Sequence, residues 1–296
     1  MAATDRAGRE FSVAVPASLV SDTPHLREKT AKLGAIARAC SIFGVNEIIL
    51  YLDDGRREQP ADFQLCFDLL NYIETPQYLR KRLFKLSPSF RFTGILPPLQ
   101  IPSHNVPHSI SKAKVGDVRE GVVIGQHRLN SVVECGLERT IECAGQFSIG
   151  KRVTVRLASL GRNLRGEIVA PSKNGTPPRD MGVYWGYRVN RAGSLGEVLM
   201  RQRWDLKVGT SRYGVPVQEV LPSLSKFLKT AQSVIIAFGS PKAGLREILA
   251  AERLDSKGVF DFFVNTVPDQ QTTTIRTEEA IFTSLSILNL AERLVG

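Results

Sequence analysis

The order in which strand-like and helix-like segments follow one another constrains the fold of this chain most strongly. Residues 11–15 (FSVAV) form a short apolar run that ends at Pro16, and residues 47–52 (EIILYL) form a second run, so both predict buried strands. Residues 25–43 and 62–73 carry apolar side chains at helical spacing. A succession of strand, helix, strand and helix is typical of a parallel sheet with helical crossovers.

A proline-rich stretch then interrupts this pattern. Residues 94–107 hold four of the 16 prolines of the chain, which predicts a linker. Beyond it we expect five short strands, at residues 116–124, 131–136, 146–149, 152–157 and 164–169, separated by Gly, Asn or polar turns. So many short strands predict a small β-barrel of the OB type, although the strand count also fits an SH3-like barrel. A second breaker, residues 170–179 (APSKNGTPPR), closes the insert.

The α/β pattern resumes after the insert. Residues 233–238 (SVIIAF) and 259–264 (VFDFFV) predict apolar strands, and residues 206–208 predict a weaker one. Residues 277–294 predict a final helix, for which we expect Thr277 to be the N-cap because two glutamates follow it. The fold class that we expect is α/β with a parallel sheet, interrupted by a β-barrel.

Length and composition fit this organisation. The 296 residues suggest one large or two modest domains, and we expect an α/β domain of residues 1–100 and 173–296 with an insert of residues 101–172. A hydrophobic share of 43% and a charged share of 23% are typical of a folded, water-soluble protein. No apolar run reaches the roughly 18 residues of a membrane span, and residues 1–10 do not read as a secretory signal, so we expect no membrane partner. Four scattered cysteines argue against a disulfide scaffold and favour a reducing compartment.

The chain is basic, with 39 Lys and Arg against 29 Asp and Glu, a net charge of +10. Such a surplus favours a polyanionic partner, because each phosphate that Lys or Arg neutralises releases condensed counterions. Residues 72–92 and 187–213 interleave aromatic and cationic side chains, a mixture that nucleic-acid binding uses. Each window alone could equally be a solvated basic face, but together they favour RNA or DNA.

Candidate ligand-binding segments follow the late strands. In open parallel sheets, ligands bind beyond the carboxyl ends of the strands, where we place residues 209–214 (GTSRYG), 239–245 (GSPKAGL), 265–271 (NTVPDQQ) and 272–277 (TTTIRT). Each could be an ordinary turn between a strand and a helix. None matches a P-loop or a dinucleotide fingerprint.

Nucleophilic and metal catalysis find little support in the residues. The four histidines lie in the first half of the chain, and His104 and His108 have no Cys or acidic partners nearby, so we expect no metal site. A Ser-His-Asp triad has no elbow motif. Loops rich in Gly, Thr, Asn and Gln suit the binding of a cofactor that supplies its own chemistry.

Several motifs carry a family resemblance. G-V-Y-W-G-Y at residues 182–187, G-T-S-x-x-G at 209–214, F-G-S at 238–240 and F-V-N-T-x-P…T-I-R-T-E-E-A-I at 263–281 closely resemble the SPOUT-class RNA methyltransferases. The branch concerned is eukaryotic and archaeal and includes the human kinetochore-associated centromere protein of this class. The resemblance covers nearly the whole chain, A-x-A-R-A-C-x-I-F and P-Q-Y-L-R-K included.

This resemblance implies a fold, a cofactor and partners. It implies a trefoil-knotted α/β domain with an OB-like insert, although a true knot is an exception to the usual rules of chain topology. It implies a homodimer that binds S-adenosylmethionine, releases S-adenosylhomocysteine and methylates ribosomal or other structured RNA. It also favours a nuclear or nucleolar location over a cytoplasmic one.

The resemblance also implies site residues. The cofactor-binding residues would be Phe238, Gly239, Ser240, Gly244, Leu245, Asn265, Thr266, Val267, Pro268, Thr274, Ile275, Thr277, Ala280 and, with a lower rank, Thr210. We expect RNA contacts at Arg80, Lys81, Arg82, Lys151, Arg152, Arg188 and Arg191. The family's arginine after Y-W-G-Y falls here on Asn190, which puts the roles of Arg188 and Arg191 in question.

The candidate catalytic residues are Arg276, Arg80 and Glu279. Arginine does not serve easily as a base, so Arg276 and Arg80 would stabilise a phosphate or a developing charge. Glu279 would accept a proton, or would be an ordinary carboxylate in the first turn of a helix.

A rival hypothesis is a non-catalytic RNA-binding or scaffold protein, in ribosome assembly or at the spindle or kinetochore, with a vestigial cofactor pocket. It explains the charge and the insert equally well. The intact glycines and the unbroken T-I-R-T-E-E-A motif favour a working pocket. A nucleotide-dependent oxidoreductase is disfavoured because its fingerprint is missing.

Overall fold

The computed structural model describes residues 9–53, 60–104, 106–169, 183–201 and 204–294. They form two compact units. The sheet unit lies within Gly8–Asn71, Ser89–Pro98 and Tyr187–Gly296, and the barrel unit within Tyr72–Pro88 and Leu99–Gly186. The boundary falls inside helix α2 (Pro60–Glu74).

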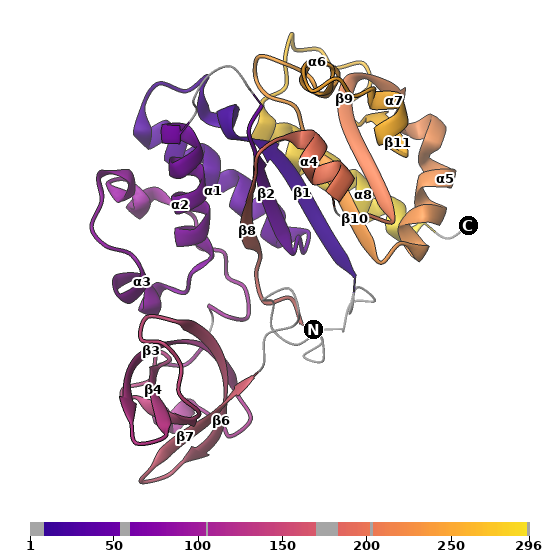
Figure 1. Ribbon diagram of the computed structural model, residues 1–296. Coiled ribbons are helices and arrows are strands. Elements are labelled where there is room, and N and C mark those ends of the chain that lie inside the picture. The colour runs from indigo at the N-terminus through magenta and orange to yellow at the C-terminus, as the bar shows by residue number, and fades with distance from the viewer. Residues whose placement is uncertain (1–8, 54–59, 105, 170–182, 202–203, 295–296) are drawn as a thin grey trace. The chain divides into compact units, whose positions relative to one another are not determined.

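A parallel sheet of six strands, in the order β11-β9-β10-β1-β2-β8, is the centre of the sheet unit (Figure 1). Every neighbouring pair in it is parallel. The middle strands are buried apolar runs, as parallel strands covered on both faces require. The prediction of a parallel α/β fold is confirmed. The strands are β1 (Glu10–Pro16), β2 (Glu47–Tyr51), β8 (Arg188–Ala192), β9 (Leu206–Pro216), β10 (Ser233–Ala237) and β11 (Phe262–Asn265).

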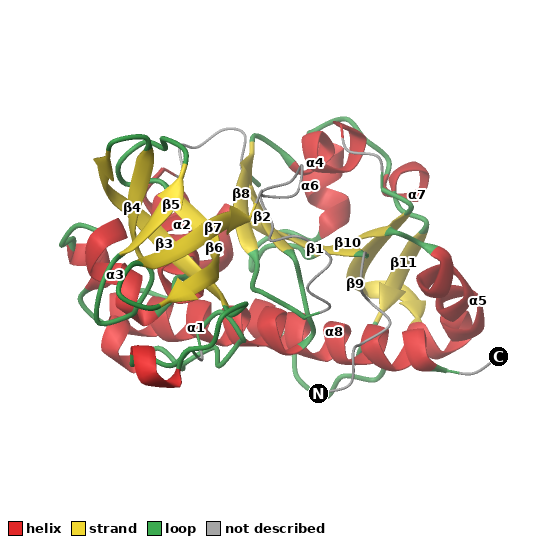
Figure 2. Cartoon of the chain, turned by 90° about the horizontal axis from the view of Figure 1, so that it is seen from below, coloured by secondary structure: helices red, strands yellow, loops and turns green. Residues whose placement is uncertain are grey.

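Helices cover both faces of this sheet (Figure 2). On one face α4 (Leu195–Arg201), α6 (Leu245–Ala251) and α7 (Ser256–Val259) share a buried core with β1, β2 and β10. On the other lie α1 (Leu26–Ile42), α5 (Val217–Thr230) and α8 (Thr277–Arg293), with α8 in contact with both α1 and α5. Short 3-10 turns η1 (Ala17–Val20), η2 (Pro88–Phe90) and η3 (Thr93–Ile95) complete the described connections.

The barrel unit contains a closed five-stranded barrel in the order β3-β4-β5-β7-β6. Its strands are β3 (Val118–His127), β4 (Asn130–Glu134), β5 (Ile141–Ala144), β6 (Arg152–Leu160) and β7 (Leu164–Val169). Strands β5 and β7 pair in parallel and all other neighbours are antiparallel. Inward side chains such as Val133, Ile141 and Val155 form its core. Outside the strands, this unit has α3 (Gln77–Leu83) and η4 (Ile110–Lys112). The predicted β-barrel is confirmed.

The structure corrects three expectations about element bounds. Residues 146–149 form no strand, and the third barrel strand is β5, whose run I-E-C-A has only two inward apolar residues and so gives a weak alternating signal. Val259 ends α7, and the last strand begins only at Phe262. Residues 170–179, the predicted second breaker, lie outside the described residues.

Two further corrections concern the segments next to the candidate site. The N-cap of α8 is Arg276, and Thr277 is its first helical residue. Strand β9 continues through the G-T-S-x-x-G motif to Pro216, where a loop after residue 208 was expected. In the part of the chain that is described, no helix has both the length and the apolar character needed to cross a bilayer.

The imidazole of His104 is partly buried in the barrel unit. Its Nε2 lies 2.6 Å from the carbonyl oxygen of Glu74, and since a carbonyl can only accept, Nε2 carries the hydrogen and donates. Burial lowers the pKa of His104 from 6.5 to about 4. The folded barrel therefore holds this side chain neutral at pH values where the unfolded chain would protonate it.

We predict that His104 makes the barrel unit less stable in mild acid. Because the folded pKa is depressed, its contribution is complete above the unfolded pKa of 6.5 and is lost as the pH falls toward about 4. The slope in that window is at most about 1.4 kcal/mol per pH unit for one proton. Urea unfolding followed by Trp185 fluorescence, in a Trp204→Phe background, measures it. His104→Gln should flatten the slope, and an unchanged slope would contradict the assignment.

Candidate functional site

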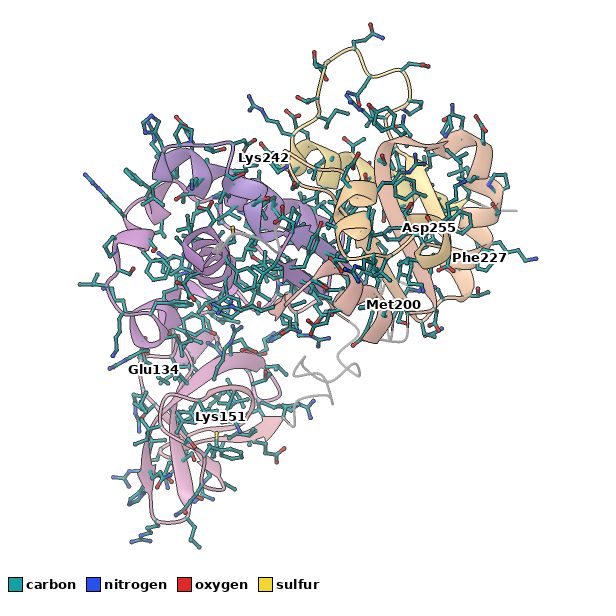
Figure 3. The ribbon with its side chains drawn as sticks, turned by 45° about the horizontal axis from the view of Figure 1, so that its top comes forward. Glu134, Lys151, Met200, Phe227, Lys242 and Asp255 are labelled. Atoms are coloured by element: carbon teal, nitrogen blue, oxygen red, sulfur yellow. The ribbon has the colours of Figure 1, made fainter. Side chains whose placement is uncertain are left out.

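Three segments of the sheet unit come together at one edge of the sheet. Strands β11, β9 and β10 are consecutive neighbours and parallel, so their carboxyl ends lie at the same edge. The loop of residues 238–244 follows β10, with Lys242 on it (Figure 3), and residues 266–276 connect β11 to α8. Residues 210–214 of β9 lie between these two loops. The edge is therefore built from the motifs that the sequence analysis singled out.

The loop after β10 is fixed at its base by buried hydrogen bonds. The hydroxyl of Tyr51, at the end of β2, donates to the carbonyl of Phe238 at 2.6 Å, and the Phe238 N–H donates to the carbonyl of Ala14 at 3.0 Å. Burial raises the pKa of Tyr51 well above its usual value, so this hydroxyl stays protonated and keeps donating. Thr210 donates from Oγ1 to the carbonyl of Ala237 at 2.9 Å.

The same loop closes as a tight turn. The Ser240 N–H donates to the carbonyl of Ala243 at 2.8 Å, and the Ala243 N–H donates to Ser240 Oγ at 3.0 Å. A Cβ added at Gly239 would lie 3.0 Å from the Ala243 oxygen and 3.1 Å from Gly244 Cα, so the backbone approaches itself too closely for a side chain. Gly244 is the N-cap of α6 and Leu245, its first residue, is fully buried.

The loop after β11 is held by side chains at its beginning. Asn265 accepts from the Val267 N–H at 2.9 Å and donates to the carbonyl of Arg212 at 3.1 Å. The hydroxyls of Thr266 and Ser284 are 2.8 Å apart and buried, which ties the loop to α8. These contacts fix the path of Pro268, which follows directly.

The other end of this loop is the start of α8. Glu279 accepts from the Arg276 N–H at 2.9 Å, as one half of a capping box, so its carboxylate has a structural role in the first turn. Thr277 is buried, whereas Thr274 and the side chain of Arg276 are exposed. Ile275 and Ala280 are half-buried. The exposed polar groups thus lie on the loop that faces the edge of the sheet.

A buried lysine ties α8 to the start of α1. Lys32 Nζ lies 2.8 Å from Asp22 and 3.5 Å from Glu278, and only 5% of its side chain is exposed. Burial opposes ionisation of Asp22, but the hydrogen bond from Lys32 and its charge outweigh burial and lower the pKa of that carboxyl. Through its contact with Glu278, Lys32 therefore helps to hold the first turn of α8 in place.

In the barrel unit, Arg152 is the centre of a buried ion-pair network. It contacts Glu74 at 2.5 and 3.0 Å and Glu120 at 2.6 Å, while Trp185 and Thr154 each donate to Glu120 at 2.7 Å. The two carboxylates are 9% and 5% exposed. Burial raises the pKa of Glu74 even though Arg152 acts in the opposite direction. The guanidinium of Arg152 is thus already neutralised within the chain.

The other basic residues of the barrel unit differ in their contacts. Arg80 donates to the carbonyls of Thr75 and Ile73 and lies over the Tyr72 ring, and Arg82 pairs with Glu134 at 2.8 Å. Lys81 is exposed, and Lys151 lies 5.0 Å from the centre of the Phe147 ring. Figure 3 marks Lys151 and Glu134 on the barrel unit. Arg80 therefore belongs to a different unit from Arg276 and Glu279.

Arg188 and Arg191 flank Asn190 on the edge strand β8 of the sheet unit. Arg188 pairs with Glu47 at 3.3 Å, and the Asn190 amide donates to the same buried carboxylate. Arg191 lies 3.8 Å from the centre of the Phe67 ring. The asparagine that departs from the family pattern is therefore a structural partner of Glu47.

The structure brings the predicted cofactor-binding residues to one edge of the sheet unit, and their role stays a prediction. Sequence reasoning missed Tyr51, whose signal is a tyrosine at the end of an otherwise aliphatic buried strand. Tyr213 lay in the predicted segment 209–214 but was not named as a site residue, and Arg246, which donates to its carbonyl, was missed. Among the described residues, no group of three or more His, Cys, Asp or Glu side chains is arranged to bind a metal ion.

Comparisons with known proteins agree with this architecture. A family model described as "Putative RNA methyltransferase" matches residues 10–288. A protein of Mus musculus named 28S rRNA (uridine-N(3))-methyltransferase is 34% identical over 98% of this chain and 79% of its own length. An uncharacterized protein of Halobacterium salinarum is 33% identical over 95% of this chain and 99% of its own length. The chain belongs to this family of RNA methyltransferases.

Similarity to solved structures is weak. The SpoU methyltransferase AviRb of Streptomyces viridochromogenes, solved with AdoMet, aligns over 97% of this chain and 61% of its own with 11% identity and a TM-score of 0.34.

We predict that Tyr51→Phe destabilises the sheet unit and loosens the loop after β10. The substitution leaves the buried Phe238 carbonyl without its donor, which costs about 1–3 kcal/mol. Urea unfolding followed by Trp204 fluorescence, in a Trp185→Phe background, measures the loss. Stability within about 0.3 kcal/mol of the parent would contradict a structural role for this hydrogen bond.

We predict that replacing two adjacent cations of the barrel unit changes its free energy of unfolding by very different amounts. Arg152→Gln should lower the free energy of unfolding by about 3 kcal/mol or more, because it leaves two buried carboxylates unpaired. Lys151→Gln, the matched control, removes an exposed charge and should change stability by less than about 0.5 kcal/mol. Equal losses of unfolding free energy in the two variants, measured by urea unfolding, would contradict this prediction.

Proposed function

We propose that this protein is an S-adenosylmethionine-dependent RNA methyltransferase whose cofactor lies against the loops at the carboxyl edge of β9, β10 and β11. One observation carries the proposal: three segments with the family motifs converge at that edge and are fixed there by hydrogen bonds from the buried Tyr51 and the partly buried Thr210, among others. Family membership supports the reaction class.

The residues at this edge fit such a cofactor. A Cβ on Gly239 would lie 3.0–3.2 Å from the backbone of residues 243–245, so a side chain there would push that backbone aside and change the main-chain surface that the loop offers a ligand. Backbone N–H and C=O groups of this loop and the loop after β11 would read the adenine edge and the ribose. When bound, the cofactor supplies a methyl group on a sulfonium sulfur. Positioning of the acceptor atom in line with that methyl then provides much of the rate.

The named relative suggests the acceptor atom, the N3 of a uridine in ribosomal RNA. Methylation there breaks the sulfur–methyl bond, forms a nitrogen–methyl bond and releases the N3 proton. The guanidinium of Arg276, exposed at the N-cap of α8, would stabilise negative charge on the neighbouring uracil oxygens. Glu279 would take the proton through the carboxylate oxygen that does not accept from Arg276.

The barrel unit would hold RNA. Its strand order, with β5 and β7 parallel and β6 next to β3, supports the OB-type assignment, and OB folds bind single-stranded nucleic acids. Lys81 and Lys151 are exposed cations that can contact phosphates, and Arg80 and Arg82 are further candidates in this unit. Arg152 would act there by holding the barrel in shape. On β8 of the sheet unit, Arg188 and Arg191 are candidates as well. The knot, the homodimer and a nuclear or nucleolar location in eukaryotes are part of the same proposal.

Calorimetric titration of the full chain with S-adenosylmethionine and S-adenosylhomocysteine tests the cofactor site. We expect binding at one site per subunit. Gly239→Ala should weaken it about tenfold, equivalent to 1.4 kcal/mol, because the new methyl group displaces the Ala243 carbonyl.

Gly94→Ala is the matched control, because nothing lies within 4 Å of an added Cβ at that position. It should bind as the parent does. Absence of binding by the folded parent would reject the enzyme and favour the RNA-binding scaffold. Equal affinities of the Gly239→Ala variant and the parent would place the cofactor elsewhere.

A further inference from the structure

The G-T-S-R-Y-G motif forms an outward excursion of β9 rather than a simple turn. Gly209 is paired with Phe263 of β11, and Val215 is paired with Val264, the next residue of β11. The five intervening residues, 210–214, therefore project out of the ladder between two consecutive partners. The excursion lies at the same edge of the sheet as the proposed cofactor loops, and the proposed function assigns only Thr210 on it.

The excursion is held firmly along its length. A Cβ added at Gly214 would lie 2.4 Å from the Val264 carbonyl carbon, so the base of the excursion is packed directly on β11. Arg212 accepts at its carbonyl from Asn265 and donates from Nη1 to the carbonyl of Thr273 at 3.2 Å. Its tip is thus tied to both ends of the loop after β11, and a ligand bound there would meet a preorganised surface.

The tip presents an exposed aromatic ring with one guanidinium over the ring and a second one bound to its main chain. Tyr213 is 63% exposed, with the guanidinium carbon of Arg212 4.6 Å from its ring centre. Arg246, on α6, donates to the Tyr213 carbonyl at 3.3 Å and lies 5.0 Å from the ring centre of Phe263. Within the described part of the chain, neither Arg212 nor Arg246 forms an ion pair with a carboxylate. A phosphate could therefore bind them without displacing an acidic partner.

We propose that Tyr213, Arg212 and Arg246 form the docking surface for a nucleotide of single-stranded RNA next to the cofactor loops. A base stacks on the Tyr213 ring, and the adjoining phosphates bind the two guanidinium groups. An exposed aromatic ring that shares a surface with arginines lacking carboxylate partners is the combination that single-strand binding uses. An acidic peptide would satisfy the cations but would give no reason for an exposed aromatic ring on a main chain that is held in place. This inference rests on the proposed function and names the substrate contact at that site.

The experiment measures binding of a fluorescein-labelled oligouridylate of about 20 nucleotides to the full chain, saturated with S-adenosylhomocysteine, by fluorescence anisotropy at several salt concentrations. Tyr213→Ala should raise the Kd about tenfold, which lies within the range for loss of one stacked base. Tyr213→Phe keeps the ring and removes only the hydroxyl that accepts from Arg212 Nη2, so it should retain most of the parental affinity. Arg246→Gln should weaken binding and reduce the salt slope by about one phosphate contact.

Lys226→Gln is the matched control for charge. Lys226 is exposed near the end of α5, which returns the chain to the amino end of β10 and so to the opposite edge of the sheet. Its Kd should differ from the parental value by less than about twofold. Parental affinity in both Tyr213→Ala and Arg246→Gln would overturn the inference.

The two proposals fail in different ways. If the parent does not bind S-adenosylhomocysteine in calorimetry, the proposed function fails, and the ratio of Kd values between Tyr213→Ala and the parent, measured without cofactor, still decides the docking surface. If the parent binds the cofactor and methylates large-subunit ribosomal RNA transcribed in vitro, while Tyr213→Ala and Arg246→Gln keep the parental KM for RNA, only the docking surface fails.

Discussion

The parallel alignment of β11, β9 and β10 is the constraint on which the candidate site depends. Parallel pairing puts the carboxyl ends of all three strands at one edge, where each connection must turn back and its peptide groups leave the ladder. The buried hydroxyl of Tyr51 and the partly buried hydroxyl of Thr210, both from neighbouring strands, donate to two of the carbonyls there. The loops are thereby fixed in place while other main-chain groups remain available to a ligand. The proposed cofactor site would thus depend on how the sheet ends, without any dedicated catalytic domain.

The arginines of the chain include two kinds, which differ in whether a carboxylate neutralises their charge. Arg152 and Arg188 have buried carboxylate partners, Glu74, Glu120 and Glu47, and so hold the two units in shape. Arg212 and Arg246 contact carbonyls and aromatic rings instead, and their charge is available to a polyanion. The net charge of +10 counts both kinds alike. Removing the first kind should affect folding, and removing the second should affect binding.

The sequence predicted what depends on local pattern. Continuous apolar runs located β1, β2 and β10, helical spacing located α1, and position after a strand located the loops at Gly239 and Asn265. It did not predict β5, whose four residues give too short an alternation, or the extent of β9, whose last residues become a strand only by pairing with β11. Tyr51 could not be linked to the site because its partner Phe238 is 187 residues away. Such contacts depend on tertiary structure, which local periodicity does not contain.

The position of the insert explains how one chain can carry a barrel without disturbing its sheet. Strands β2 and β8 are adjacent and in regular register, Glu47 opposite Arg188, although the whole barrel lies between them in sequence. Within the barrel unit, the entering and leaving segments lie side by side: a Cβ on Gly186 would be 2.7 Å from the Glu74 carboxylate, and its φ of +132° also favours glycine. Because the two ends of the insert meet, it occupies one crossover connection and imposes no change on the strand pairing. Surface residues of the barrel can therefore vary in sequence while the ladder that positions the loops after β10 and β11 stays intact.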